Sequence, residues 1–249
     1  MSPSRPWYET FFDRLYGSVL AAQFEPARSR KQAQVVKQLL GVRKGHRVLD
    51  VPCGHGRLTI PLARMGLWMT GVDRTEAYLL QARRAARKHE LAIRFLCRDM
   101  RRIDFNDEFD GAFNWFGSFG YFSDRDNLQF CERVFQALKP GGRFLVQGIN
   151  KSWMLKNFEK RRQWLVDGVT IRERNRWDSR QQRLSGVWKL SRGRQSAERH
   201  IQLRIYNGTE IRAVLRQAGF REIKLHGWPQ LDRFTRHSPQ WIAVGRHPL

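Results

Sequence analysis

Between residues 47 and 149, short runs of apolar residues alternate with longer stretches in which apolar residues recur every three or four positions. The short runs are typical of buried strands, and the longer stretches are typical of amphipathic helices. The predicted strands lie near residues 47–51, 68–72, 92–96, 109–115 and 143–149. The predicted helices lie near residues 57–65, 75–89 and 124–138. This alternation predicts a parallel sheet with helices on both faces, whose ligand lies at the carboxyl ends of the strands.

The N-terminal residues and the residues after 150 follow other patterns. Residues 7–16 and 30–40 have the spacing of amphipathic helices, and Gly41 ends the second one. After residue 150, apolar and basic residues alternate, which predicts an antiparallel sheet with one apolar face and one basic face. Its predicted strands lie at residues 169–177, 183–190 and 199–206.

The last part of the chain predicts one helix and a closing pair of strands. The helix covers residues 209–218, with Asn207 or Thr209 as its N-cap and Gly219 as its end. The strands lie at residues 220–225 and 241–245. A chain of 249 residues is long enough to bury one sizeable core and to carry an insertion.

The most specific motif follows the first predicted strand. Gly54 and Gly56 lack a Cβ atom, so the backbone can turn sharply there and approach a ligand closely. The helix that follows begins with free backbone N–H groups. Asp73 ends the second strand, 19 residues after Gly54, where an acid can accept hydrogen bonds from both hydroxyls of a ribose. The motif therefore predicts a ligand built on adenosine.

Neighbouring residues narrow the choice of adenosine ligand. The third glycine of the dinucleotide pattern would fall at Thr59, and the Lys-Ser/Thr pair of a P-loop is absent. Asp50 ends the first strand beside the turn, where it would repel a pyrophosphate but not a cationic sulfonium that carries an amino group. S-adenosylmethionine therefore fits better than NAD or ATP.

With these residues, the chain resembles the class I S-adenosylmethionine-dependent methyltransferases. Their first motif, acid-x-Gly-x-Gly-x-Gly, is matched from Asp50 to Gly56, with Pro52 in place of the first glycine. Segments 93–100, 109–116 and 138–147 match later motifs in the same order. The resemblance implies an α/β fold: a doubly wound, seven-stranded, mostly parallel sheet with N-terminal helices and an antiparallel insertion after the fifth strand.

The resemblance also implies residue roles and a division of the chain. Asp99 would contact the adenine amino group, and the backbone N–H of Met100 would contact the ring. The expected cofactor-binding residues are Asp50, Cys53, Gly54, Gly56, Asp73, Arg74, Asp99, Met100 and Asn114. We expect a helical lid at residues 1–45, a cofactor-binding core at 46–150, a substrate-covering insertion at 151–206, and the rest of the core at 207–249.

The segment after the fourth strand bears on the acceptor. It reads Asn114-Trp-Phe-Gly117, without the Asn/Asp-Pro-Pro-Tyr/Phe motif of the enzymes that methylate exocyclic amines of nucleic acids. Cys53 lies in the cofactor loop and Cys131 in a helix, which disfavours a cysteine nucleophile for pyrimidine C5 methylation. Aromatic residues and glycines continue to Phe122, and this loop either contacts the substrate or packs into the core.

Methyl transfer from a sulfonium chiefly requires the nucleophile to be positioned and water to be excluded, so a general base is optional. Tyr121 and His55 are the candidates for such a catalytic role, although packing or surface roles are the alternative for both. The expected substrate contacts are Tyr16, Trp115, Ser118 and Tyr121.

The net charge of +23 keeps a second acceptor class open. A small-molecule N or O acceptor is favoured by the compact chain and by the absence of a separate RNA-binding module. The alternative is an RNA or ribosomal RNA methyltransferase that uses a basic surface, because clustered cations bind phosphates. A module that binds the cofactor without transferring methyl is a third hypothesis. The basic surface would comprise Arg172, Arg174, Arg176 and Arg204.

Other features limit the cofactors and the compartment. The three cysteines and seven histidines lack the spacing of metal ligands, so no metal is expected. The odd number of scattered cysteines suits a reducing compartment, and no N-terminal signal segment is visible, so we expect a cytoplasmic protein. The chain has no apolar run of 18 residues, so no membrane span is expected. The oligomeric state stays open.

Overall fold

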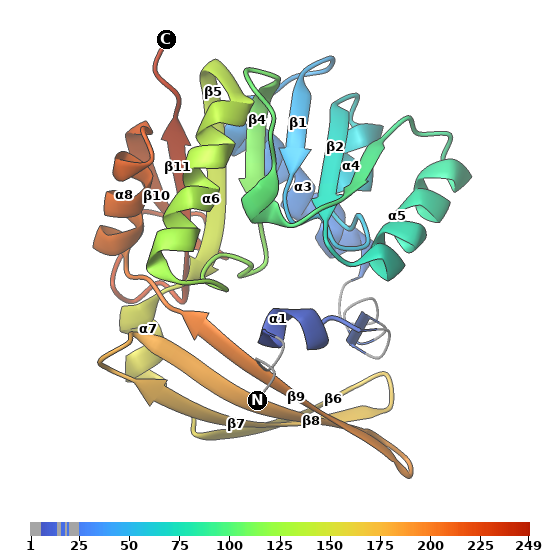
Figure 1. Ribbon diagram of the computed structural model, residues 1–249, viewed down its shortest axis with the longest axis vertical. Coiled ribbons are helices and arrows are strands. Elements are labelled where there is room, and N and C mark those ends of the chain that lie inside the picture. The colour runs from blue at the N-terminus through green and yellow to red at the C-terminus, as the bar shows by residue number, and fades with distance from the viewer. Residues whose placement is uncertain (1–5, 14–15, 18, 20–24) are drawn as a thin grey trace.

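The computed structural model describes residues 6–13, 16, 17, 19 and 25–249. Its larger sheet has seven strands in the order β10-β11-β5-β4-β1-β2-β3 (Figure 1). Strands β1 to β5 pair in parallel, and β11 pairs antiparallel with both β5 and β10. The strands are β1 (Arg47–Asp50), β2 (Trp68–Asp73), β3 (Arg94–Cys97), β4 (Phe109–Asn114), β5 (Leu138–Ile149), β10 (Arg221–Trp228) and β11 (Gln240–Arg246).

This arrangement confirms the predicted fold class. The order of the strands reverses between β1 and β4. From β1 the chain runs outward through β2 to β3 on one side, and from β4 it runs outward to β5 on the other side. Ligands of doubly wound sheets bind at such a reversal, outside the carboxyl ends of the strands. The start of β5 differs from the prediction: it begins at Leu138 rather than near residue 143, directly after the helix before it.

Helices cover both faces of the sheet (Figure 1). Buried residues of α6 and α8 pack in one apolar cluster with Ala112 and Phe144, whereas α3 and α4 pack in another cluster with Phe113 and Leu145. Alternate residues of β4 and β5 thus point to opposite clusters, as the pleat of a strand requires. The helices are α3 (Pro26–Leu40), α4 (Thr59–Arg64), α5 (Glu76–Lys88), α6 (Asp124–Ala137) and α8 (Gly208–Gln217).

The start of α8 shows how local sequence fixes an element. The side chain of Asn207 accepts a hydrogen bond from the N–H of Glu210 at 2.9 Å, and the Glu210 carboxylate accepts one from the N–H of Asn207 at 2.8 Å. The two residues therefore satisfy each other's backbone donors in a capping box. Of the two predicted N-caps, Asn207 is confirmed, and Gly219 follows the helix with a φ of 106°.

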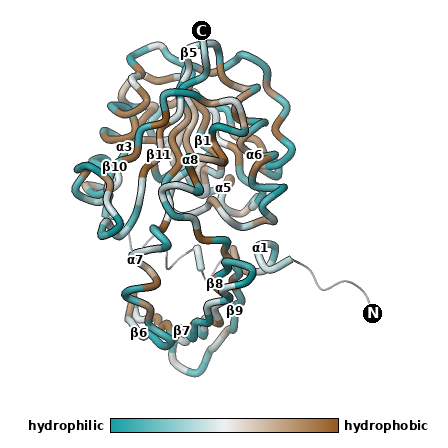
Figure 2. Tube along the Cα trace, turned by 90° about the vertical axis from the view of Figure 1, so that its left-hand side faces the viewer, coloured by the Kyte–Doolittle hydropathy of each residue, from teal (hydrophilic) through white to brown (hydrophobic). Residues whose placement is uncertain are grey.

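A second sheet lies outside the carboxyl ends of the core strands (Figures 1 and 2). We call it the insertion sheet. It follows the short helix α7 (Lys151–Lys156), and neighbouring strands pair antiparallel. Its strands, in order, are β6 (Arg161–Val166), β7 (Val169–Asp178), β8 (Arg183–Arg192) and β9 (Gln195–Arg204).

The sequence predicted only three of these four strands. The missing one, β6, has an exposed side chain at four of its six positions, and only Trp164 and Val166 are partly buried. Because only two residues of this edge strand point inward, its alternation of apolar and polar residues is too short to be recognised next to the basic residues 160–162. Helix α7 was also missed.

The N-terminal helix is shorter than predicted. Helix α1 covers Trp7–Thr10, and the chain bends over residues 11–13 instead of continuing as a helix to residue 16. The side chain of Asp13 accepts a hydrogen bond from the N–H of Tyr16 at 2.9 Å, which begins a separate turn. Helix α1 lies between the core and the insertion sheet, close to β9 (Figure 1). Residues 14, 15, 18 and 20–24 of the expected lid lie outside the described residues.

Candidate active site

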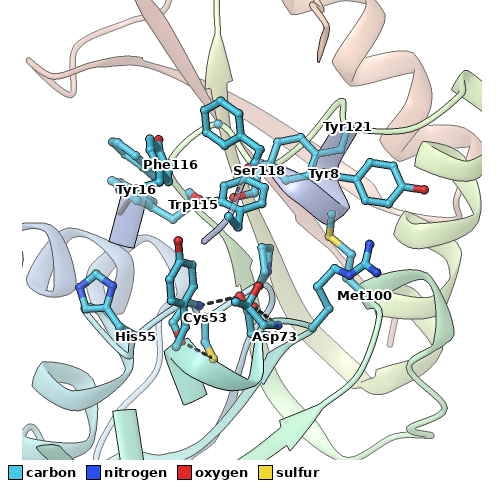
Figure 3. Close-up of a pocket in the computed structure, with 18 of the residues that line it drawn as sticks. Tyr8, Tyr16, Cys53, His55, Asp73, Met100, Trp115, Phe116, Ser118 and Tyr121 are labelled. Atoms are coloured by element: carbon cyan, nitrogen blue, oxygen red, sulfur yellow. Dashed lines mark hydrogen bonds between the residues drawn. The ribbon is translucent and has the colours of Figure 1, made fainter. Parts of the chain in front are cut away.

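A cavity of about 250 Å³ lies where the core, the N-terminal residues and the insertion sheet meet. The loops after β1, β2 and β3 form one part of its wall, which we call the donor half (residues 50–58, 73–78 and 98–100). The remaining wall, the acceptor half, comes from residues 7–12 and Tyr16, from residues 115–122 after β4, and from β5, β8 and β9. Figure 3 shows Asp73 and Cys53 across the cavity from the aromatic side chains.

The glycine loop and Asp73 are joined directly by a hydrogen bond in the structure. The N–H of Gly54 donates a hydrogen bond to Asp73 Oδ2 at 2.9 Å, and the N–H of Thr75 donates one to Oδ1 at 2.8 Å. The φ of Gly54 is +55°, which favours glycine, and a Cβ atom there would meet nothing within 4 Å. Burial raises the pKa of Asp73, although the two backbone hydrogen bonds oppose this shift.

Asp50 lies at the end of β1 beside the same loop. It is buried, and its carboxylate accepts a hydrogen bond from Thr59 Oγ1 at 2.6 Å. Burial raises the pKa of Asp50 to about 8, despite this hydrogen bond. The neighbouring Cys53 is also buried, and burial raises its pKa well above the usual value, so its thiol stays protonated at neutral pH. A protonated thiol is a weak nucleophile.

Asp99 is held by a residue that sequence reasoning missed. Arg101 donates from Nε to Asp99 Oδ1 at 3.0 Å and from Nη2 to Oδ2 at 2.7 Å, and its guanidinium lies 4.2 Å from the centre of the Phe122 ring. Burial alone would raise the pKa of Asp99, but the hydrogen bonds from Arg101 outweigh it and hold the pKa below its usual range. The Asp-x-Arg spacing was the available signal in the sequence.

Seven of the nine expected cofactor-binding residues line the cavity. Gly56 and Asn114 do not; they lie beneath its wall. Gly56 faces Ala82 of α5, whose Cβ would be 3.2 Å from an added Cβ, so this glycine allows close packing of the loop. Asn114 donates from Nδ2 to the carbonyl of Val51 at 2.9 Å, while its buried Oδ1 has no hydrogen-bond partner.

All four expected substrate contacts, Tyr16, Trp115, Ser118 and Tyr121, line the cavity. Tyr121 donates to Ser118 Oγ at 3.4 Å, and Ser118 donates to the carbonyl of Trp115 at 3.2 Å. The sequence did not identify the wall residues of the insertion sheet, Trp188, Ile201 and Leu203. Their only signal was the apolar alternation of the predicted strands, which does not show what the strands cover.

The two candidates for proton transfer differ in chemistry. Burial raises the pKa of Tyr121 far above neutrality, so its hydroxyl can donate a hydrogen bond but cannot accept a proton at neutral pH. Burial and the nearby Arg57 lower the pKa of His55, which therefore stays neutral and able to accept a proton. His55 lies in the donor half and Tyr121 in the acceptor half.

The expected basic surface is only partly present. Arg172, Arg174 and Arg176 are exposed on the face of β7 opposite to the buried Ile171. Arg204 was assigned to the same surface, and that assignment is wrong. It is buried at the junction of core and insertion, because it pairs with Asp124 at 3.0 Å and with Glu210 at 3.1 Å.

A family model described as a methyltransferase domain matches residues 48–142, which hold β1 to β4, the glycine loop and Asp73. Residues 48–142 thus form a methyltransferase domain of the class I S-adenosylmethionine-dependent type. The chain is 34% identical over 109 residues to a ubiquinone biosynthesis O-methyltransferase of Bradyrhizobium diazoefficiens, which is 44% of this chain and 42% of that protein. The chain thus spans less than half the length of the curated relatives it matches.

Solved methyltransferases share the fold over nearly the whole chain. An S-adenosylmethionine-dependent methyltransferase from Clostridium acetobutylicum has a TM-score of 0.80 and 17% identity, over 94% of this chain and 97% of that one. CalS10, an amino pentose methyltransferase from Micromonospora echinaspora with bound S-adenosylmethionine, has a TM-score of 0.66 and 18% identity, over 94% and 98%. At such identities the likeness shows the fold of this chain, including the insertion after β5.

Across residues 6–13, 16, 17, 19 and 25–249, no group of three histidine, cysteine or acidic side chains is placed to hold a metal ion. No helix in those residues has the length and apolar character needed to cross a membrane.

Proposed function

We propose that the protein transfers a methyl group from S-adenosylmethionine to a nitrogen or oxygen atom of a small molecule. The observation that carries this proposal is the link between Gly54 and Asp73, with the cavity directly beside it. The loop brings a backbone without side chains to the cavity, and the acid beside it can accept hydrogen bonds from a ribose. The insertion sheet closes the other side of the cavity.

The residues of the donor half fit the parts of this cofactor. Asp73 suits the ribose hydroxyls, and Asp99, kept ionised by Arg101, can accept a hydrogen bond from the adenine amino group. Asp50 offers a carboxylate to the ammonium group of the methionine part. The open space above Gly54 accommodates a ligand without moving the loop. These assignments extend the resemblance to the family residue by residue, and binding measurements on variants will test them.

When bound, S-adenosylmethionine supplies a methyl group that its sulfonium already activates. The protein then has to orient the acceptor and exclude water. Trp188, Ile201 and Leu203 of the insertion sheet shield the cavity from one side, and residues 7–12 and Tyr16 shield it from another. Tyr121 and Ser118 can donate hydrogen bonds to a polar group of the acceptor. His55 is the residue that could hold a proton during transfer.

An RNA acceptor is less well supported. The exposed arginines of β7 lie on the face of the insertion sheet that points away from the apolar cluster of Ile171 and Leu190, and none of them lines the cavity. An RNA bound to Arg172, Arg174 and Arg176 would therefore contact the side of the sheet opposite to the methyl donor. The residues that line the cavity instead favour a small-molecule acceptor.

The test is transfer of labelled methyl from S-adenosylmethionine into a cell extract, with the RNA, protein and small-molecule fractions separated afterwards. We expect label in the small-molecule fraction. The Asp73→Asn variant keeps the size of the side chain but removes its charge, and we expect it to lower cofactor affinity by about tenfold to a hundredfold. Label in RNA that disappears when Arg172, Arg174 and Arg176 are replaced together would contradict the small-molecule proposal.

A further inference from the structure

All the charged side chains among the described lining residues of the cavity come from one of its two halves. Among the described lining residues, every carboxylate, guanidinium and imidazole belongs to the donor half. These side chains are Asp50, His55, Arg57, Asp73, Arg74, Arg98 and Asp99. The described part of the acceptor half has no ionisable group apart from tyrosine hydroxyls. Its side-chain polar groups are therefore uncharged: the hydroxyls of Tyr8, Tyr16, Ser118 and Tyr121, and the indole N–H groups of its tryptophans.

Aromatic rings make up most of the acceptor half, and they pack against one another. The centre of the Trp188 ring lies 5.4 Å from the ring centre of Phe11 and 6.0 Å from that of Tyr16, and both pairs pack edge to face. Trp7 lies 4.9 Å from Tyr121 in the same geometry. Each such contact stabilises the wall by about 0.5–1.5 kcal/mol beyond the apolar area it buries. The rings are therefore held in place before a ligand enters.

The orientation of Trp188 is fixed from behind the wall. Its indole N–H donates a hydrogen bond to Glu173 at 2.9 Å, and Glu173 is buried and does not line the cavity. Arg199, which lies opposite Trp188 on the neighbouring strand β9, forms an ion pair with Asp13. Trp188 therefore presents its apolar surface, and not its polar N–H, to the cavity.

This partition has a physical consequence for the acceptor. Arg57 lies 5.7 Å from the centre of the Phe116 ring, and Arg74 lies 5.2 Å from the centre of the Tyr8 ring. An ionised carboxylate or phosphate held among the other rings of the acceptor half, away from these two guanidinium groups, would lose its hydration without gaining a charged partner. A protonated amine would find ring faces that attract cations. However, it has no lone pair with which to attack until it loses a proton, and the described lining residues that could accept this proton, the carboxylates and His55, all belong to the donor half. An uncharged aromatic molecule meets neither obstacle.

We propose that the acceptor is an uncharged aromatic molecule that is methylated on a nitrogen or hydroxyl oxygen attached to, or part of, its ring system. This inference rests on the proposed function and specifies its substrate. The lone pair of the acceptor atom forms the bond to the methyl carbon, while the carbon–sulfur bond breaks and its electron pair stays on sulfur. A proton on the acceptor atom is then released to water, and the products are the methylated acceptor and S-adenosylhomocysteine.

The experiment measures ternary binding with matched pairs of probes that differ in one charge. The protein is saturated with S-adenosylhomocysteine, whose own binding is first measured by calorimetry. Quenching of tryptophan fluorescence then compares catechol with protocatechuate, and aniline with anthranilate. We expect the neutral member of each pair to bind at least about tenfold more tightly, a difference of about 1.4 kcal/mol.

A variant makes the test specific to the acceptor half. Leu203→Lys places a cation in the wall and should shift the preference between catechol and protocatechuate toward the anion by about tenfold or more. The matched control is Leu165→Lys, because Leu165 belongs to the same sheet but is 68% exposed and does not line the cavity. It should leave the preference unchanged.

The outcomes separate this inference from the proposed function. A charged probe that binds the wild-type protein as tightly as its neutral partner would overturn the inference, as would a panel in which no neutral aromatic probe binds. Either result, obtained with normal S-adenosylhomocysteine binding, leaves the methyltransferase proposal standing. Failure to bind S-adenosylhomocysteine would instead overturn the proposed function, and the inference with it.

Discussion

The side-chain oxygen of Gln147 accepts a hydrogen bond from the backbone N–H of Phe116 at 2.7 Å. The same oxygen accepts one from the N–H of Gly117 at 3.1 Å, and Gln147 donates from Nε2 to Gln240 at 2.9 Å. Phe116 has a φ of +68°, a left-handed conformation that costs a residue with a side chain about 1 kcal/mol or more. A buried glutamine on β5 thus holds the loop that carries Phe116 to the mouth of the cavity.

Replacing Gln147 with Met should release this loop without changing the size of the buried side chain. We expect kcat/KM for the acceptor to fall by about tenfold, while the affinity for S-adenosylhomocysteine changes by less than about twofold. The Gln240→Met variant is the control, because it removes the hydrogen bond to Gln147 Nε2 and keeps both bonds to the loop. Equal losses of acceptor turnover and S-adenosylhomocysteine affinity in Gln147→Met would show that the loop does not act on the acceptor alone.

Asp50 predicts a pH dependence of cofactor binding. Its pKa of about 8 means that the carboxyl group is largely protonated at pH 6, and an ammonium group binds the ionised form. Binding then requires loss of this proton, so the affinity for S-adenosylhomocysteine should rise with pH between about 5.5 and 7. Calorimetry in buffers of different ionisation enthalpy will measure the proton released. Asp50→Asn should bind more weakly, with little pH dependence in this range; an unchanged slope in this variant would exclude Asp50 as the group that titrates.

Arg101 is expected to act on adenine recognition through Asp99. Arg101→Gln removes the bidentate contact, so the Asp99 carboxylate loses both its fixed orientation and its lowered pKa. We expect discrimination between S-adenosylhomocysteine and its inosine analogue, which lacks the amino group, to fall by about tenfold. Competition binding of the two ligands will measure this ratio. Arg102→Gln is the neighbouring control, and a ratio that falls equally in both variants would argue against a specific role for Arg101.

Arg204 should contribute to stability rather than to nucleic-acid binding. Arg204→Met leaves Glu210 partly buried with one cation fewer, and we expect a loss of about 2–4 kcal/mol in the free energy of unfolding. Arg172→Met, at an exposed position of β7, should change it by less than about 0.5 kcal/mol. Urea unfolding of the two variants will compare these values, and equal stabilities would contradict the structural role of the buried arginine.

Much of the fold follows from local patterns in the sequence. The strands of the core were predicted to within a few residues, because each is a short buried run beside a helix of clear periodicity. The capping box at Asn207 and the turn at Gly54 depend on residues close together in the chain, so the sequence contains all the atoms that decide them. Where the pattern was weak, as in the mostly exposed β6, prediction failed.

The sequence by itself determined the order of the core elements and the glycine loop with its acid, because backbone conformation and hydrophobic periodicity act over a few residues. Only the tertiary structure decided what the acceptor half contains. Trp188 reaches the cavity, and Arg204 leaves the surface, through contacts with residues more than 60 positions away. Alternation along a strand shows that two faces differ, but burial and charge pairing depend on what packs against each face.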